Sequence, residues 1–190
     1  MPSRTRDKRS RLVDAAIKLV HRRGFHRTTL AELADDARVP LGNVYYYFKT
    51  KEAVGEALIE RYMSEYEAML SAWDAEPDPK ARLGAFIQTT VDRKDIIAQS
   101  GCPIGSLSSE LNKDGGHLAD CTSRLFAEQL AWAEQQFRLL GNSKSVAYGH
   151  AVHLLSAIEG ASLLTHSFGD PKYVVQESQR LRAWIRDLGE

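Results

Sequence analysis

The sequence has few cysteines and no long apolar run, and each of these shortages excludes a class of protein. Its 190 residues include two cysteines, Cys102 and Cys121, whose spacing fits neither a disulfide framework nor a zinc site. No apolar stretch approaches the roughly 18 residues of a membrane span, and the N-terminal residues lack the apolar segment of a signal peptide. We therefore expect a cytoplasmic protein with no membrane partner.

Patterns typical of catalytic and cofactor sites are also missing. Neither cysteine is followed by an obvious pattern of histidine and carboxylate residues, and no glycine-rich phosphate loop follows a strand. The six histidines show no metal-ligand spacing. We expect no enzyme activity, no cofactor and no metal.

The net charge of zero conceals an asymmetry between the two parts of the chain. Residues 1–51 contain 12 Lys/Arg and 5 Asp/Glu, whereas residues 52–190 contain 13 and 20. A basic head on an acidic body indicates that the head alone binds a polyanion, although a solvated charged surface is the alternative. We predict two domains with these boundaries.

Apolar residues recur at helical spacing almost throughout, which predicts an all-α fold. In the head, Thr29 and Glu32 have the spacing of a capping box, and Pro40 suits the first position of a further helix. Thr50 can cap a fourth, longer helix. Two short helices joined by a tight turn over residues 36–39 predict a helix-turn-helix, with a plain three-helix bundle as the alternative.

The stretch VPLGNVYYYFKTKE, residues 39–52, contains three consecutive tyrosines. Neighbouring side chains on a helix point about 100° apart, so at least one ring must be exposed. Val44 and Phe48 are expected to pack inward. A lysine in the first turn of a helix opposes the macrodipole, so Lys51 indicates a bound phosphate or else an exposed lysine tolerated at small cost.

The order of a basic first helix, Gly-Phe, Thr-Thr, a short helix and Val-Tyr-Tyr-Tyr-Phe-Lys-Thr-Lys-Glu resembles the N-terminal domain of TetR-type transcriptional regulators over roughly residues 8–58. The resemblance implies a homodimer that binds palindromic double-stranded operator DNA, usually as a repressor released by a small molecule. It also implies an N-terminal three-helix domain followed by a larger helical ligand-binding and dimerisation domain.

The resemblance assigns roles to single residues of the third helix. It places Tyr45 at a phosphate contact, Tyr46 at a base edge or thymine methyl, and Tyr47 where relatives often carry a phosphate-contacting histidine. In the recognition helix of a helix-turn-helix the leading turn reads bases. Here that turn holds Leu41, Gly42 and Asn43, and the Asn43 amide can bond adenine in two places. Thr29 is a further candidate phosphate contact through its backbone, although its capping role explains it equally well.

The body must provide a dimer interface and a ligand pocket. His153, Ala157, Gly160 and Leu164 form one stripe with small residues at its centre, which favours close helix packing. The family dimerises through its last two helices, so Leu181 and Trp184 on the final helix could complete the interface. The alternative is that the stripe packs inside the subunit.

Bulky residues such as Phe86 and Trp132 are the expected lining of a mostly apolar effector pocket between helices. Cys102 is expected near or at this effector site. It precedes Pro103 and so lies where a helix N-terminus would favour its thiolate. The predicted function is a ligand-responsive transcriptional repressor. The alternatives are a thiol-based redox or electrophile sensor or enzyme centred on Cys102, in which that cysteine is reactive, and a DNA-binding protein without ligand control. A buried, inert Cys102 is the opposing interpretation.

Overall fold

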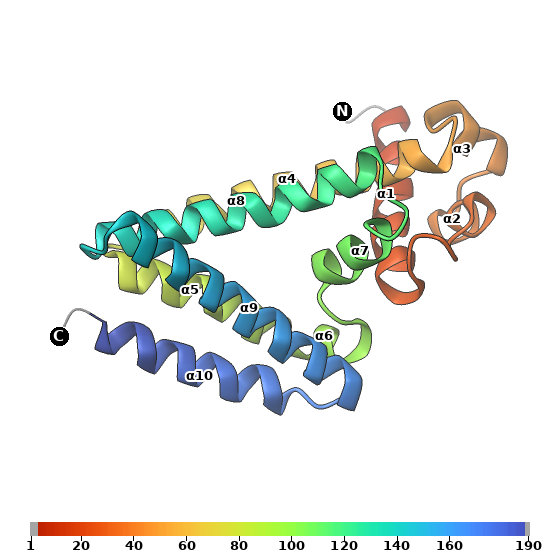
Figure 1. The fold of residues 1–190 in the computed structure, drawn as a ribbon. Coiled ribbons are helices and arrows are strands. Elements are labelled where there is room, and N and C mark those ends of the chain that lie inside the picture. Colours follow the sequence, from red (N-terminus) through yellow and green to blue (C-terminus); the bar gives the residue numbers. More distant parts are fainter. Residues whose placement is uncertain (1–3, 189–190) are drawn as a thin grey trace. The chain divides into compact units, whose positions relative to one another are not determined.

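We describe the protein from a computed structural model, which covers residues 4–188 with side chains from Lys8 onward. Over this range the chain is helical and contains no strand, so the predicted all-α class is confirmed (Figure 1). The described helices are α1 (Arg4–Arg23), α2 (Leu30–Ala37), α3 (Leu41–Tyr47), α4 (Lys51–Asp74), α5 (Pro79–Asp92), α6 (Lys94–Ser100), α7 (Pro103–Leu111), α8 (His117–Leu139), α9 (Lys144–Phe168) and α10 (Lys172–Asp187).

The helices form two compact units that differ from the predicted division at residue 51. The first unit contains Met1–Glu65 and Ser106–Ser123, and the second contains Tyr66–Gly105 and Arg124–Glu190. The described part of the chain has no helix that combines the length and the apolarity needed to cross a membrane.

In the first unit, α1 packs against α2 and α2 packs against α3. The buried face of α1 includes Leu12, Val13 and Ala16, which are at most 3% exposed. Val44 and Phe48 are also buried, as expected. Burial of these two side chains fixes which face of α3 points away from the protein.

The turn between α2 and α3 is shorter than predicted. Asp36 and Ala37 remain helical, and α2 ends at Ala37. The following residue, Arg38, caps the helix with a left-handed backbone and φ of 51°. The Arg11 guanidinium donates hydrogen bonds to the carbonyls of Ala37 and Arg38. A cation at the C-terminal carbonyls of a helix satisfies acceptors that have no partner within it. Pro40 immediately precedes α3 instead of occupying its first position.

A carboxylate holds the turn that links α1 to α2. Glu110, near the end of α7, accepts hydrogen bonds from the backbone N–H groups of Phe25 at 2.8 Å and His26 at 2.7 Å. Gly24 has φ of 87°, and a Cβ on it would lie 2.7 Å from Glu110 Oε2. Only glycine combines this backbone conformation with so close an approach.

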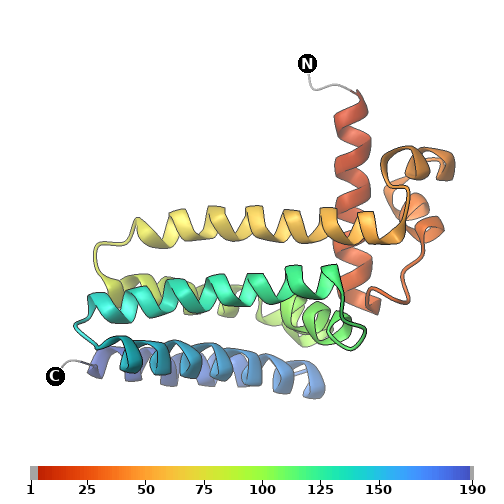
Figure 2. The ribbon, with the colours of Figure 1, turned by 45° about the horizontal axis from the view of Figure 1, so that its top comes forward.

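In the second unit, α10 packs against both α5 and α9, and these helices run alongside one another (Figure 2). Aromatic rings fill the core between helices. The Trp73 ring lies 5.1 Å from the rings of both Phe86 and Trp132, measured between centroids. Edge and tilted contacts of this kind stabilise a core beyond their buried area.

The Glu110 contact yields a prediction about stability. Replacing Glu110 with Gln leaves one acceptor oxygen for two N–H donors and removes the negative charge. We expect a loss of about 1–3 kcal/mol in the free energy of unfolding, because one N–H group loses its acceptor and the other loses a bond to a charged group. Chemical denaturation of both variants measures it, with Glu67→Gln, an exposed glutamate on α4, as the control. Equal stability of the two variants would contradict this role for Glu110.

Candidate functional site

The outward face of α3 carries exposed aromatic and apolar side chains. Tyr46 is 71% exposed, Tyr45 49% and Leu41 42%. The prediction that at least one ring of the three tyrosines is exposed is therefore confirmed. Tyr47 is partly buried and meets the Tyr46 ring edge-on at 5.0 Å between centroids. Two tyrosine hydroxyls and an apolar side chain are thus available for an external partner.

The first turn of α3 is open to close approach. A Cβ added at Gly42 would meet no atom within 4 Å, so no described part of the protein covers this position. Asn43 is partly exposed, and its backbone N–H bonds the Pro40 carbonyl at 2.8 Å. Asn43 lies on the short helix α3, which packs against the protein through the buried side chain of its neighbour Val44.

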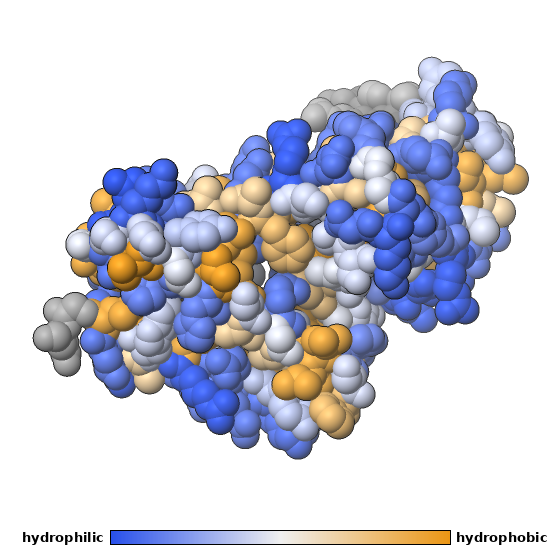
Figure 3. Space-filling view, viewed as in Figure 1, coloured by the Kyte–Doolittle hydropathy of each residue, from blue (hydrophilic) through white to orange (hydrophobic). Residues whose placement is uncertain are grey.

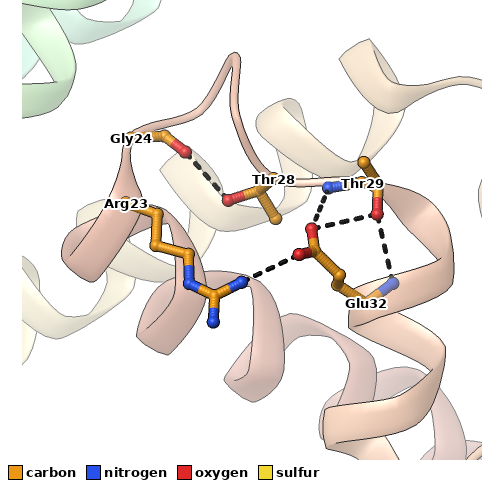
Figure 4. Close-up of polar contacts among 5 residues, drawn as sticks. All are labelled: Arg23, Gly24, Thr28, Thr29 and Glu32. Atoms are coloured by element: carbon orange, nitrogen blue, oxygen red, sulfur yellow. Dashed lines mark hydrogen bonds and ion pairs between the residues drawn. The ribbon is translucent and has the colours of Figure 1, made fainter.

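The predicted capping box at the start of α2 is present and confirmed (Figure 4). Thr29 Oγ1 accepts from the Glu32 N–H at 3.2 Å, and Glu32 Oε2 accepts from the Thr29 N–H at 3.0 Å. The Arg23 guanidinium bonds the second Glu32 oxygen at 2.8 Å, and Thr28 Oγ1 donates to the Gly24 carbonyl at 2.8 Å. These bonds to Thr29, followed by the charge of Arg23, lower the pKa of Glu32. Capping uses the Thr29 backbone N–H, so the structure adds no support for a phosphate there.

Lys51 has a role that the sequence did not reveal. Its ammonium donates to the His26 carbonyl at 2.8 Å and lies 5.0 Å from the centroid of the Phe25 ring. This contact offers a reason for a lysine in the first turn of α4 that needs no phosphate. An ammonium has three donors, however, and the carbonyl uses one of them. No short sequence signal predicts this contact, because His26 and Lys51 are 25 positions apart.

A cavity of about 90 Å³ lies within the second unit. Phe86 and Cys102, both predicted to line an effector pocket, line this cavity together. Trp132 does not line it but packs behind it, with its ring 5.6 Å from the Phe86 ring. The residues that sequence reasoning missed include Tyr66, Arg93 and Glu159. They come from helices whose mutual packing the sequence does not specify.

Cys102 lies just before α7, as predicted, but its surroundings favour the protonated thiol. Burial raises the pKa of this thiol, and the neighbouring Glu159 carboxyl raises it further. The Gly105 N–H donates to Cys102 Sγ at 3.4 Å, a weak contact that does not offset burial. Burial likewise raises the pKa of Glu159. Cys102 is partly exposed by its accessible surface, but the raised pKa of its thiol favours the inert cysteine over the reactive thiolate, the two interpretations left open.

The predicted interface residues on α9 and α10 divide into two groups. Gly160 and Leu164 are exposed, whereas Ala157 packs against the core of the second unit. The exposed His153 ring meets Trp184 edge-on at 4.8 Å within the subunit. Leu181 is 1% exposed and belongs to the core. The structure therefore corrects the assignment of Leu181, which has no surface to offer a partner.

Further exposed apolar side chains on α9 were missed by sequence reasoning. They are Val146, Tyr148, Val152, Leu163 and Phe168. Orange apolar surface alternates with blue hydrophilic surface over the C-terminal helices in Figure 3. The periodicity of apolar residues in α9 was weak, because the helix is apolar on several faces. The buried face could therefore not be separated from the exposed one.

Comparison with known proteins relates the first unit to a family of regulators. Residues 12–58 match the family model for bacterial regulatory proteins of the tetR family. The HTH-type transcriptional repressor NemR of Escherichia coli (strain K12) is 33% identical over 110 residues, 57% of this chain and 54% of NemR. The HTH-type transcriptional repressor DhaR of Mycobacterium sp. (strain GP1) is 28% identical over 55% of this chain and 52% of DhaR. The matches thus span about half the length of these relatives.

Solved structures share the fold over almost the whole chain. A TetR-family transcriptional regulator from Streptomyces coelicolor superposes with a TM-score of 0.84 at 18% identity, covering 97% of both chains. The reduced form of NemR from E. coli gives a TM-score of 0.76 at 24% identity, covering 93% of this chain and 96% of NemR. At these identities the likeness concerns the fold alone.

The raised pKa of the Cys102 thiol yields a prediction about reactivity. A raised pKa lowers the thiolate fraction at any given pH, and the thiolate is the nucleophile. In Cys121→Ser, where Cys102 is the remaining thiol, alkylation by iodoacetamide at pH 7.5 is expected to be at least about 10-fold slower than for a free cysteine. The rate is expected to keep rising with pH above 9. The matched variant is Cys102→Ser, which retains Cys121. A fast reaction of Cys102 at neutral pH would restore the thiolate interpretation.

Proposed function

We propose that the chain is a cytoplasmic transcriptional repressor of the TetR family of bacterial regulatory proteins, whose family model matches residues 12–58. It binds palindromic operator DNA as a homodimer through α3, and a small molecule in the cavity of the second unit releases it. The observation that carries the proposal is the outward face of α3, where Tyr45 and Tyr46 are exposed on a helix anchored by buried Val44.

Charge supports DNA as the partner of this face. Residues 1–51 carry a net charge of +7 from 12 Lys/Arg and 5 Asp/Glu, while the rest of the chain is acidic. Lys/Arg side chains that neutralise phosphates release counterions, which supplies the sequence-independent part of DNA affinity. The Lys51 ammonium contributes to this part with the two donors that the His26 carbonyl leaves available.

Sequence-specific recognition is assigned to the first turn and the exposed face of α3. Asn43 is the proposed base-reading residue, since its amide can bond an adenine edge twice. Tyr46 reaches a base edge or thymine methyl, and Leu41 makes apolar contact beside it. Gly42 allows close approach without reading a base, and a Cβ there would meet nothing within 4 Å. Tyr45, Tyr47 and Thr29 are assigned to the phosphate backbone.

The exposed face of α9 supports a dimer. Gly160 is open, with no atom within 4 Å of a Cβ placed there, and Leu164 beside it is 45% exposed. Exposed Leu163 and Phe168 extend the apolar surface toward the end of the helix. Small residues flanked by large apolar ones allow two helices to approach closely. We assign this face to the partner subunit, with His153, Ala157 and Trp184 at its border.

Release by a ligand requires a difference in affinity between two conformations of the repressor. Shifting a population from 1:99 to 99:1 needs about 5.5 kcal/mol of differential binding, which two cavities in a dimer can share. The coupling is reciprocal, so operator DNA weakens ligand binding by the factor by which the ligand weakens DNA binding. A sensor or enzyme centred on a Cys102 thiolate is not favoured, because burial raises the pKa of that thiol.

A pair of substitutions tests the DNA-binding assignment. Asn43→Ala is expected to weaken binding to the selected operator by about 1–3 kcal/mol with little effect on unrelated DNA. Lys51→Ala is expected to weaken binding to all sequences and to reduce the salt slope of log K by about one. Fluorescence anisotropy over a range of salt concentrations measures both effects.

Tyr173→Phe is the control, because Tyr173 stacks on Phe168 in the second unit and has no assigned contact with DNA. Thermal unfolding of Lys51→Ala is measured in parallel, since this variant also loses the bond to the His26 carbonyl. If Asn43→Ala and Lys51→Ala both retain wild-type affinity while remaining folded, α3 is not the DNA-binding element.

The proposed dimer predicts the effect of a charge on α9. Gly160→Arg leaves the subunit intact, because space is open at that position, but places a bulky cation in the interface. Sedimentation analysis at micromolar concentration is expected to show a dimer for the wild type and a monomer for this variant. Gln135→Arg adds the same charge on an exposed position of α8 and is expected to remain dimeric. A dimer that persists in Gly160→Arg would place the interface elsewhere.

A further inference from the structure

One residue that lines the cavity carries a polar group with no partner within the described part of the protein. The Tyr66 side chain is 1% exposed, and its hydroxyl has less than 1 Å² of accessible surface and makes no hydrogen bond. Buried hydroxyls are nearly always bonded, because removing one from water without a partner is unfavourable. Tyr66 is the one such case among the described side chains, and it lines the cavity of the second unit.

The surroundings of the Tyr66 hydroxyl make it a hydrogen-bond donor. Burial raises the pKa of Tyr66, and the nearby carboxylates of Glu128 and Asp74 raise it further. The phenol therefore keeps its proton at physiological pH. Asp74 already accepts a hydrogen bond from Trp132 Nε1 at 3.1 Å. What the Tyr66 hydroxyl lacks is an acceptor.

The remaining wall of the cavity is mostly apolar. Trp73, Phe86, Ile97 and Ile158 line it, and the Tyr66 ring meets Trp73 edge-on at 5.9 Å between centroids. A second polar group, Thr89 Oγ1, is already engaged, because it accepts from Trp73 Nε1 and donates to the Ala85 carbonyl, each at 3.2 Å. The walls thus favour an apolar molecule with few polar atoms.

The charged groups around the cavity favour a ligand without charge. Arg93 lines the cavity and is a cation that would repel an ammonium group. Glu159 lines it as well, and the carboxylates of Asp74 and Glu128 act on Tyr66. Negative charge beside the Tyr66 hydroxyl disfavours an anionic acceptor at that atom. The volume of about 90 Å³ limits the ligand to a small molecule.

We infer that the cavity binds a small, uncharged molecule with an apolar body and one carbonyl-type oxygen. This oxygen accepts a hydrogen bond from the Tyr66 hydroxyl once the side chains that now cover the hydroxyl shift to admit it. The inference deepens the proposed function and rests on it in one respect, namely that the molecule bound in this cavity is the effector. The apolar body packs against Trp73 and Phe86. Tyr66 selects the ligand because its hydroxyl gains the acceptor that the protein does not supply.

The test compares two matched probes on the full-length protein without DNA. Cyclopentanone carries the carbonyl oxygen, and methylenecyclopentane has the same shape without an acceptor. Ligand-observed NMR titrations give the dissociation constants for wild type and Tyr66→Phe. The substitution is expected to weaken cyclopentanone binding about 3- to 10-fold, the range for one net hydrogen bond. Methylenecyclopentane binding is expected to stay equal or to tighten.

For each probe, the effect of Tyr66→Phe is the ratio of the dissociation constants of the variant and the wild type. Comparing these two ratios cancels the different free energies of transferring each probe from water. Tyr173→Phe makes the same chemical change on α10, away from the cavity, and is expected to leave both constants unchanged. In the free protein, Tyr66→Phe is expected to keep or raise the thermal unfolding midpoint, since the hydroxyl has no bond to lose.

Several results would overturn the inference. One is that neither probe binds, and another is that Tyr66→Phe affects the two probes equally, as it would if a water molecule satisfied the hydroxyl. Tighter binding of cyclopentylammonium or cyclopentanecarboxylate than of cyclopentanone would reject an uncharged ligand. A lower unfolding midpoint in Tyr66→Phe would reveal an internal partner for the hydroxyl. These measurements omit DNA, so a ketone that binds through Tyr66 yet fails to release the operator counts against the proposed function alone.

Discussion

The Glu110 carboxylate supports the geometry of the first unit. Its two oxygens receive the N–H groups of Phe25 and His26, and the turn they belong to determines how α1 leads into α2. Lys51 contacts the same turn through the His26 carbonyl, which ties the start of α4 to it. The elements on either side of α3 therefore converge on a three-residue turn that is held by one acidic and one basic side chain. Gly24 is the residue that makes room for the acid.

Local chemistry made much of the first unit predictable from the sequence. The Thr29 and Glu32 pair and the cap at Thr50 each act within a few residues. The orientation of α3 followed from spacing alone, because only one side of a short helix can be buried. By contrast, Glu110 lies 85 positions from Phe25, and nothing near either residue indicates the contact. The missed role of Lys51 has the same origin.

In the second unit the errors have a different cause. Helix α9 is apolar around much of its circumference, so the periodicity of its sequence could not separate the buried face from the exposed one. On α10, Leu181 was assigned to the dimer interface although it lies in the core. The environment of Cys102 depends on Glu159, which α9 contributes from 57 residues further along the chain. A pKa depends on every charged and apolar group nearby, whatever its place in the sequence. The helix N-terminus that the sequence did reveal was the weaker influence.

Gly105 limits how the cavity could change over time. A methyl group at this position would collide with the Glu159 carboxylate, although the backbone itself is helical there and would accept alanine. Substitutions at the two positions are therefore coupled, because a larger residue at position 105 requires the end of the Glu159 side chain to shift or the residue at position 159 to become smaller. In a lineage that acquires a new effector, a change at either position would alter the packing of the other. The pair restricts which specificities neighbouring sequences can reach by single steps.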